Sequence, residues 1–318
     1  MEATNIISFR DEWRNRWIML REIVLYPIKE YIIFRGKFQV TENYAIAAQK
    51  EAAARDPNVP QWLNFGYWQE AQSYNDACAA LARRLGEMAE LKAGDQLLDV
   101  GFGLAEQDLQ WVRENNVSSI TGLNVTELQV EIAKERVAKA GLAERINLQV
   151  GSATDIPFQD NSFDKVTALE CAFHFDTRED FLAEAFRVLR PGGTVAIADC
   201  LPRVGRKIDF WLRMNSKKSF MPVANLYDHR VYVEKLKRLG FVNIKVEIIN
   251  EYVWPAWVYY FGQVGITVSS HNIGQESRDD IVIDLQKNNP GIEGWLKNWG
   301  WFMGFDDYVL FSAEKPSV

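Results

Sequence analysis

The sequence has few cysteines and no long hydrophobic run. Its 3 cysteines, Cys78, Cys171 and Cys200, are too few and too scattered for a disulfide framework or a zinc site, and they indicate free buried thiols in a reducing cytoplasm. The longest apolar run, residues 253–261, is well short of the roughly 18 residues that a membrane span needs. The N-terminus has early acidic residues and lacks the apolar region of a signal peptide. We therefore expect a cytoplasmic protein without an integral membrane segment.

The sequence also lacks an excess of basic residues. With 36 Lys and Arg against 43 Asp and Glu, the formal net charge is -7, which argues against a nucleic-acid footprint. The length of 318 residues, with 47% hydrophobic and 25% charged, fits one large domain or one domain with a cap. The unusual count is 11 tryptophans. The sequence leaves the oligomeric state open, with a homodimer among the options.

The order of the elements predicts the fold class. Residues 1–75 are aromatic and predict an N-terminal helical cap, whereas residues 76–249 alternate between strands and helices, with Asn75 as the expected first N-cap. Residues 250–306 form a long aromatic insert, and residues 307–318 form a last strand. This alternation predicts an α/β fold with a doubly wound, seven-stranded, mostly parallel sheet and an antiparallel finish. The insert and the N-terminal zone are expected to cap the carboxyl ends of the strands, where such sheets bind ligands.

A glycine-containing turn follows the first strand of this core. The segment LLDVGFGLAEQDL places Asp99, Gly101 and Gly103 at the end of a buried strand, just before a helix. The glycines let a ligand approach the backbone, and Asp99 can accept hydrogen bonds from an ammonium group or from loop amides. The turn is not a phosphate-binding P-loop, and residues 104–106 break the dinucleotide fingerprint. By itself the turn also fits a tight strand-to-helix connection without a ligand.

Four motifs in order resemble the class I S-adenosylmethionine (SAM) methyltransferases. They are LLDVGFG, ITGLNVTELQVEIAKERV, GSATDIPFQDNSFDKVTALE and VLRPGGTVAIAD. The resemblance covers about residues 64–200 and implies a Rossmann-like methyltransferase fold with SAM as cofactor. Within that superfamily the chain is similar to the small-molecule branch of tocopherol, sterol, ubiquinone-pathway and sugar O-methyltransferases. NFGYW (64–68) is similar to the segment with which that branch closes over the cofactor.

The resemblance implies which residues surround SAM. Gly101 and Gly103 would lie against its methionine part, and Glu170 near its methyl group. The full predicted set is Tyr67, Asp99, Gly101, Gly103, Asn124, Val125, Gln129, Ser152, Ala153, Thr154 and Glu170. The chain departs from the family pattern at three of its positions, which could weaken SAM affinity without removing the site: Ala105 replaces the third loop glycine, Ser152 an adenine-binding Asp, and Asn124 a ribose-binding acid.

Glu170 and His174 stand out in the apolar run ALECAFHF (168–175). A buried carboxylate is costly unless something compensates its charge. Related sugar O-methyltransferases carry a His-His pair at Phe173 and His174, with the first as base, and cyclopropane-forming relatives carry a Glu at Phe173. The chain therefore lacks that base and retains Glu170, His174 and Asp199, of which Asp199 is expected to be structural. Contact between Glu170 and His174 would need a turn at residues 171–173. Two alternative interpretations remain: Glu170 holds the cofactor, and His174 is a histidine of the core.

A basic segment, LPRVGRKIDFWLRMNSKKSF (201–220), follows the fifth strand. It could hold a phosphate or diphosphate beside an apolar tail, or it could be a solvated helix face. Mg²⁺ would help diphosphate binding, but no compact metal-ligand motif demands it. The residues predicted to contact the substrate are Trp68, Phe173, Arg203, Arg206, Lys207 and Trp211.

These features resemble bacterial C-methyltransferases of prenyl diphosphates such as geranyl or farnesyl diphosphate. In those relatives a glutamate at the position of Glu170 takes the proton from the methylated carbocation, and Tyr67, Trp68 and Trp211 are candidates for contact with the cation. The leading hypothesis is this reaction on a small lipophilic substrate, with Glu170, His174 and Tyr67 as catalytic candidates. One alternative is O- or N-methylation of a sugar, phenol or polyketide with His174 as base. Another is a catalytically silent SAM-fold partner protein.

Overall fold

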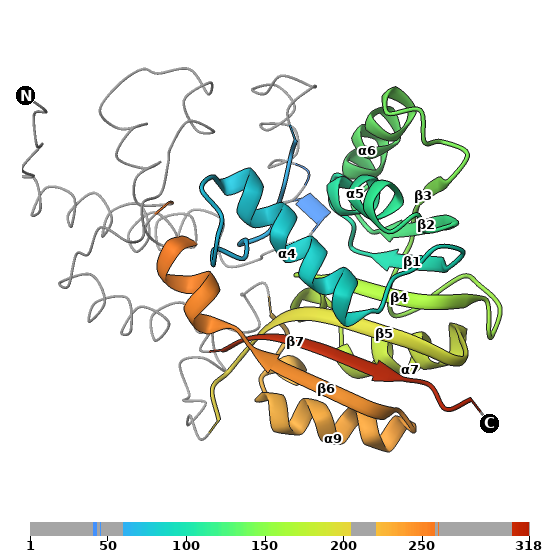
Figure 1. Ribbon diagram of the computed structural model, residues 1–318. Coiled ribbons are helices and arrows are strands. Elements are labelled where there is room, and N and C mark those ends of the chain that lie inside the picture. The colour runs from blue at the N-terminus through green and yellow to red at the C-terminus, as the bar shows by residue number, and fades with distance from the viewer. Residues whose placement is uncertain are drawn as a thin grey trace, which may run out of the picture.

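The computed structural model describes residues 41–42, 45, 60–204, 221–257, 260 and 307–317. Within them one sheet has the strand order β3-β2-β1-β4-β5-β7-β6 (Figure 1). All neighbours pair in parallel except β7, which is antiparallel to both β5 and β6. The strands are β1 (Gln96–Val100), β2 (Ser119–Asn124), β3 (Ile146–Val150), β4 (Phe163–Leu169), β5 (Leu189–Leu201), β6 (Val242–Ile248) and β7 (Asp307–Glu314). The predicted seven-stranded, mostly parallel sheet with an antiparallel finish is confirmed.

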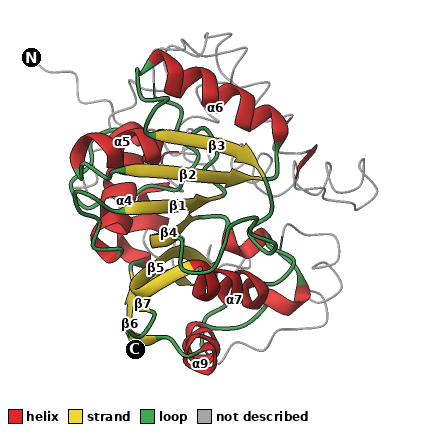
Figure 2. Ribbon diagram, turned by 90° about the vertical axis from the view of Figure 1, so that its right-hand side faces the viewer, coloured by secondary structure: helices red, strands yellow, loops and turns green. Residues whose placement is uncertain are grey.

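Helices cover both faces of the sheet (Figure 2). One buried cluster lies beneath α4, α5 and α6, and a second lies beneath α7 and α9. This arrangement is the doubly wound, Rossmann-like methyltransferase fold. The helices are α4 (Tyr74–Met88), α5 (Glu106–Glu114), α6 (Glu127–Lys139), α7 (Arg178–Val188) and α9 (His229–Leu239), with short 3-10 helices η2 (Ala172–His174) and η3 (Val223–Asn225).

Local sequence signals set where the helices begin. The hydroxyl of Ser73 accepts a hydrogen bond from the Asp76 N–H at 3.1 Å and caps α4. The expected cap Asn75 instead lies inside the helix, because Ser73 supplies the oxygen two residues earlier. Thr177 and Asp228 cap α7 and α9 in the same way.

The antiparallel β7 brings a distant part of the sequence to the carboxyl ends of the parallel strands. In the register, Leu169 of β4 pairs with Ala198 of β5, and Cys200 pairs with Tyr308 of β7. Because β7 runs in the opposite direction, its first residues lie beside the last residues of β4 and β5. Tyr308 therefore lies at the edge of the sheet where a doubly wound fold binds ligands.

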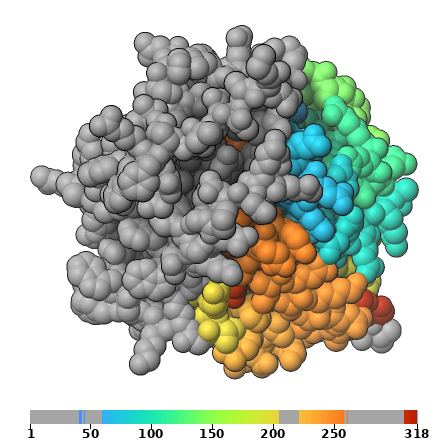
Figure 3. Space-filling model, turned by 60° about the vertical axis from the view of Figure 1, so that its left-hand side comes forward, coloured from blue at the N-terminus to red at the C-terminus, as the bar shows by residue number. Residues whose placement is uncertain are grey.

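The segment before α4 lies against the segment after β6 (Figure 3). The Trp68 N–H donates to the Tyr252 carbonyl at 2.7 Å, and the rings of Tyr67 and Tyr252 lie 5.1 Å apart. Most of the predicted caps, including residues 46–59 and 261–306, lies outside the described residues, so those domain boundaries stay predictions. None of the helices in the described ranges combines the length and apolarity that crossing a membrane requires.

Candidate active site

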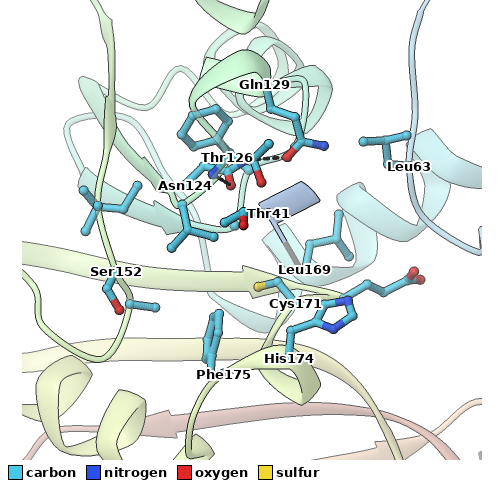
Figure 4. Close-up of a pocket in the computed structure, with 18 of the residues that line it drawn as sticks. Thr41, Leu63, Asn124, Thr126, Gln129, Ser152, Leu169, Cys171, His174 and Phe175 are labelled. Carbon is cyan, nitrogen blue, oxygen red and sulfur yellow. Dashed lines mark hydrogen bonds between the residues drawn. The ribbon is translucent and has the colours of Figure 1, made fainter. Parts of the chain in front are cut away.

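A cavity of about 300 Å³ lies at the carboxyl ends of β1, β2 and β4. This volume is at the lower end of the range of small-molecule sites. Asn124, Thr126 and Gln129 line one side of it, and His174 and Phe175 line the opposite side (Figure 4). The cavity therefore lies at the carboxyl ends of the strands, where the sequence predicts ligand binding.

The glycine turn forms the floor of this cavity. Gly101 and Gly103 have φ of +70° and +58° and line the cavity. A Cβ on Gly101 would come within 2.5 Å of the Cys171 Cβ, so glycine is required there for packing as well as for the left-handed backbone. Ala105, at the position of the family's third glycine, adopts φ of +63° at the N-cap of α5. The alanine thus keeps the turn at the cost of some backbone strain.

A small amide network lies on the β2 side of the cavity. The Asn124 Nδ2 donates to Gln129 Oε1 at 2.9 Å, and Asn124 Oδ1 accepts the Thr126 N–H at 3.1 Å. Both amide ends of Asn124 are thereby engaged, and they orient Gln129. The other end of the Gln129 amide points toward the side of the cavity lined by Leu63 (Figure 4). Gln129 therefore presents a hydrogen-bond donor to a ligand.

The residues that the resemblance implies beside adenine, Ser152, Ala153 and Thr154, also line the cavity. Val125, which the resemblance implies on the ribose and methionine side, lines it too. The hydroxyls of Ser152 and Thr154 are 2.9 Å apart, and the Thr154 N–H donates to Ser152 Oγ at 3.2 Å. The loop after β3 is thus held in a defined turn beside the cavity.

Glu170 directly follows β4 and lines the cavity in a strained conformation with φ of +52°. Its Oε1 accepts the Phe65 N–H at 2.9 Å and the Tyr308 hydroxyl at 2.6 Å. Burial raises the pKa of Glu170 to about 8, whereas the hydrogen bonds from Tyr308 and Phe65 lower it. Such a carboxyl changes charge near neutral pH.

His174 lies at the end of η2 and lines the same cavity. The chain thus turns directly after Glu170, as contact between Glu170 and His174 would require. The His174 N–H donates to the Cys171 carbonyl at 3.0 Å and closes this turn. The Phe173 ring lies 4.3 Å from the imidazole and is itself buried in the core. The structure therefore brings Glu170 and His174 into one cavity and keeps Phe173 out of its wall.

Three further predicted site residues lie away from the cavity wall. Asp99 is fully buried behind the glycine turn, and it is not among the residues that line the cavity. Tyr67 donates its hydroxyl to Gln69 Oε1 at 2.5 Å, also away from the cavity. Trp68 is 1% exposed, because its ring packs against the Tyr74 and Tyr260 rings and its indole N–H donates to the Phe65 carbonyl at 2.8 Å.

The basic segment is described only at its start. Arg203 is largely exposed, and its Nε donates to Asp307 Oδ1 at 3.4 Å. Arg206, Lys207 and Trp211 lie outside the described residues. Within the described ranges, no cluster of three His, Cys, Asp or Glu side chains could hold a metal ion.

Other residues of the wall did not stand out from the sequence. Gln61, Leu63 and Asn64 line the cavity from the segment before α4. The Gln61 N–H donates to Glu106 Oε1 at 3.0 Å, and Glu106 also pairs with Arg136. In the sequence, only the resemblance of residues 64–68 to a closing segment indicated this region. The hydrogen bonds that hold it, to Glu106 and Glu170, join residues far apart in the sequence, so no local pattern predicts them.

Two carboxyl groups are buried together between β1 and α5. Asp99 accepts hydrogen bonds from Gln107 Nε2 at 3.0 Å and from Thr167 Oγ1 at 2.7 Å. The Asp108 oxygens are buried and accept no hydrogen bond within the described residues. Burial raises the pKa of Asp99 to about 7, and burial with the charge of Asp99 raises the pKa of Asp108 well above its ordinary range. A protonated Asp108 that donates to Asp99 satisfies both groups.

Asp108→Asn is expected to stabilise the protein most at alkaline pH. Because the folded pKa values are raised, the pair stabilises the fold when protonated and loses that stability as pH rises through about 7. An amide keeps a donor to Asp99 and cannot ionise. The free energy of unfolding in urea, at about pH 6 and about pH 8.5, should favour the variant more at the higher pH. Glu131→Gln, on the exposed side of α6, is the control. An equal effect at both pH values would contradict the shared proton.

The cavity suits SAM. Its wall offers backbone at Gly101 and Gly103, the Gln129 amide and the Ser152 hydroxyl. Among the described residues that line it, two are acidic, Glu170 and Asp176, and none is a lysine or arginine. Such a wall favours a ligand with net positive charge, and the sulfonium of SAM supplies one.

Comparison with known proteins supports this assignment. A family described as a methyltransferase domain matches residues 98–197. The chain is 36% identical over 266 residues to the erythromycin 3''-O-methyltransferase of Saccharopolyspora erythraea, covering 81% of this chain and 84% of that protein. It is 34% identical over 199 residues to the 27-O-demethylrifamycin SV methyltransferase of Amycolatopsis mediterranei, covering 61% and 72%.

A solved structure shows the same fold. The geranyl diphosphate C-methyltransferase of Streptomyces coelicolor A3(2) superposes with a TM-score of 0.61 at 17% identity, covering 87% of this chain and 98% of that one. This likeness concerns the fold alone. With the motifs, the fold and an extended relative in agreement, the chain belongs to the class I SAM-dependent methyltransferases, in their small-molecule branch.

Proposed function

We propose that the protein transfers the methyl group of SAM to a hydroxyl oxygen of a lipophilic natural product, such as a sugar or polyketide hydroxyl. The observation that carries the proposal is the position of His174 in the wall of the cavity that suits SAM. The two relatives described above support the acceptor class, because their names refer to methylation of oxygens in erythromycin and in a rifamycin.

The chemistry assigns separate roles to the residues of the wall. SAM, when bound, supplies an electrophilic methyl group. An attacking hydroxyl must lose its proton, and histidine is the commonest side chain for that task. His174 is therefore the proposed base. The glycine turn and the Gln129 amide would hold the donor, and the segment 61–65 would exclude water from above it.

C-methylation of a prenyl diphosphate is the second candidate. The observation that favours it is the aromatic setting of Glu170: the Phe65 ring lies 5.3 Å from Trp254 and 6.4 Å from Tyr308, whose hydroxyl donates to Glu170. Aromatic faces stabilise a cation, and Glu170 would take its proton. A diphosphate would be held by the basic segment that begins at Arg203, with help from Mg²⁺.

A product panel tests the proposal. The protein is incubated with SAM and hydroxylated macrolides, their glycosides, phenols, and geranyl, farnesyl and geranylgeranyl diphosphates, with Mg²⁺ or with EDTA. Mass spectrometry should find one added methyl group on a hydroxylated polyketide or glycoside, and fragmentation should place it on oxygen. Methylation of the prenyl diphosphates alone would establish the second candidate. Release of no S-adenosylhomocysteine (SAH) with any acceptor would favour a silent partner protein.

Glu170→Gln separates the two reactions. The amide oxygen can still accept hydrogen bonds from Phe65 and Tyr308, so the cavity should keep its shape. If oxygen is methylated with His174 as base, kcat at saturating SAM should fall by less than about 10²-fold, because general-base catalysis is retained. A loss of all product with SAM still bound would instead identify Glu170 as the base of a carbocation reaction.

A further inference from the structure

Tyr308 connects the last strand of the sheet to the cavity. It is fully buried near the start of β7, and its hydroxyl donates to Glu170 Oε1 at 2.6 Å. Its backbone N–H donates to Asn250 Oδ1 at 2.6 Å, and its ring lies 5.8 Å from the Trp254 ring. The side chain is therefore held from several directions, and its hydroxyl has a fixed position at the cavity.

The same carboxylate oxygen also holds the segment over the cavity. Phe65, from the segment before α4, donates its N–H to Glu170 Oε1 at 2.9 Å, and the Phe65 and Tyr308 rings meet edge to face at 6.4 Å. One oxygen of Glu170 thus joins three parts of the chain, at β4, β7 and the segment 61–68. Two hydrogen-bond donors to one carboxylate oxygen stabilise the charged form of Glu170.

Among the described residues, no lysine or arginine is a cause of the pKa shift of Glu170. Burial is the main cause that raises the pKa of Glu170, and the charge of Asp199 adds a smaller increase; the hydrogen bond from the Tyr308 hydroxyl is the largest cause that lowers it. The titratable groups that face Glu170 are Asp199 and Cys200 on β5, Tyr308 on β7, Tyr74 on α4, and Cys171 and His174 after β4.

We infer that Tyr308 is a positioning residue of the methyl-donor site, whose hydroxyl stabilises the ionised form of Glu170 in the cavity wall, and that this ionised form makes the site prefer positively charged SAM over its neutral product SAH. SAM and SAH share the same amino, carboxyl and nucleoside groups and differ in the methyl group and in the charge on sulfur. A carboxylate in the wall discriminates between them by charge, which favours release of SAH after transfer. The inference rests on SAM occupying the cavity and not on the acceptor of the proposed function.

Tyr308→Phe tests this inference by calorimetric binding. The dissociation constants of SAM and SAH are measured between about pH 6.5 and pH 9.5, and their ratio cancels the titration of the groups that the two ligands share. In the unchanged protein the preference for SAM should grow as pH rises through about 8, where Glu170 loses its proton. Loss of the hydrogen-bond donor raises the pKa of Glu170. The midpoint of the pH dependence of the SAM-to-SAH preference should therefore move upward by about one pH unit in Tyr308→Phe.

Two further variants make the result specific. Tyr232→Phe removes another buried tyrosine hydroxyl, one without a hydrogen-bond partner among the described residues, and should leave the midpoint in place. Glu170→Gln should make the ratio independent of pH, and it keeps the test decisive if Tyr308→Phe does not fold. The inference is overturned if the unchanged protein shows no pH-dependent preference for SAM, or if Tyr308→Phe keeps the original midpoint. Because no acceptor is present, these outcomes are separate from failure of the proposed reaction.

Discussion

His174→Ala is expected to lower kcat for the hydroxylated acceptor by about 10²- to 10⁴-fold, the usual contribution of a general base. The imidazole lies in the cavity wall, and its neighbour Phe173 carries no ionisable group and is buried. The variant should bind SAM nearly as well as the unchanged protein, because the glycine turn and the Gln129 amide are untouched. Steady-state kinetics with saturating SAM and calorimetric SAM binding measure the two effects separately.

The control for this variant is His229→Ala. His229 begins α9 and does not line the cavity, so its loss should change kcat little. Added imidazole should restore part of the activity of His174→Ala, since a small base can enter the space left by the side chain. An unchanged kcat in His174→Ala would remove His174 as the base, and the carbocation mechanism with Glu170 would then become the stronger candidate.

The sequence predicted several residues of the cavity wall because those residues fall in short motifs. Gly101 and Gly103 follow a strand in one motif, and Asn124 and Gln129 belong to the next. A doubly wound sheet brings the carboxyl ends of its parallel strands together. Motif order therefore predicts which loops form the wall without any knowledge of side-chain packing.

The direction of individual side chains was not predictable in the same way. Asp99 is part of the strongest motif, yet Gln107 and Thr167 engage its carboxylate behind the turn. Trp68 lies in the segment that covers the cavity, yet its indole packs into a separate aromatic cluster with Tyr260. Both outcomes depend on how helices and loops pack on the sheet, which sequence spacing does not encode.

Tyr308 shows a second limit of sequence reasoning. It is 138 residues from Glu170 along the chain, and no motif links the two. The contact arises because β7 inserts antiparallel between β5 and β6 and places its first residues at the carboxyl edge. The sequence predicted this last strand and its antiparallel pairing, but not the register that sets Tyr308 beside the cavity.

Asp199→Asn is expected to lower the free energy of unfolding by about 3–5 kcal/mol, because it leaves Arg178 buried without its counter-charge. Both side chains are fully buried, and the Arg178 Nε and Nη2 donate to the two Asp199 oxygens at 2.7 and 3.2 Å. Arg178 also donates to the carbonyls of Cys200 and Asn225, and so ties the start of α7 to β5 and η3. Asp199 thus has a structural task, as its strand-end position predicted.

Urea denaturation of matched variants separates the cost of an unpaired charge from the net contribution of the ion pair. Asp160→Asn makes the same change in an exposed pair with Arg187 and should cost less than about 1 kcal/mol. The double variant Arg178→Met with Asp199→Leu removes both charges and should recover much of the stability lost in Asp199→Asn, since a buried pair gains little over apolar packing. Equal losses in Asp199→Asn and Asp160→Asn would show that the buried pair does not hold α7 to the sheet. A folded Asp199→Asn that binds SAM normally but has lost all turnover would assign Asp199 to the chemistry instead.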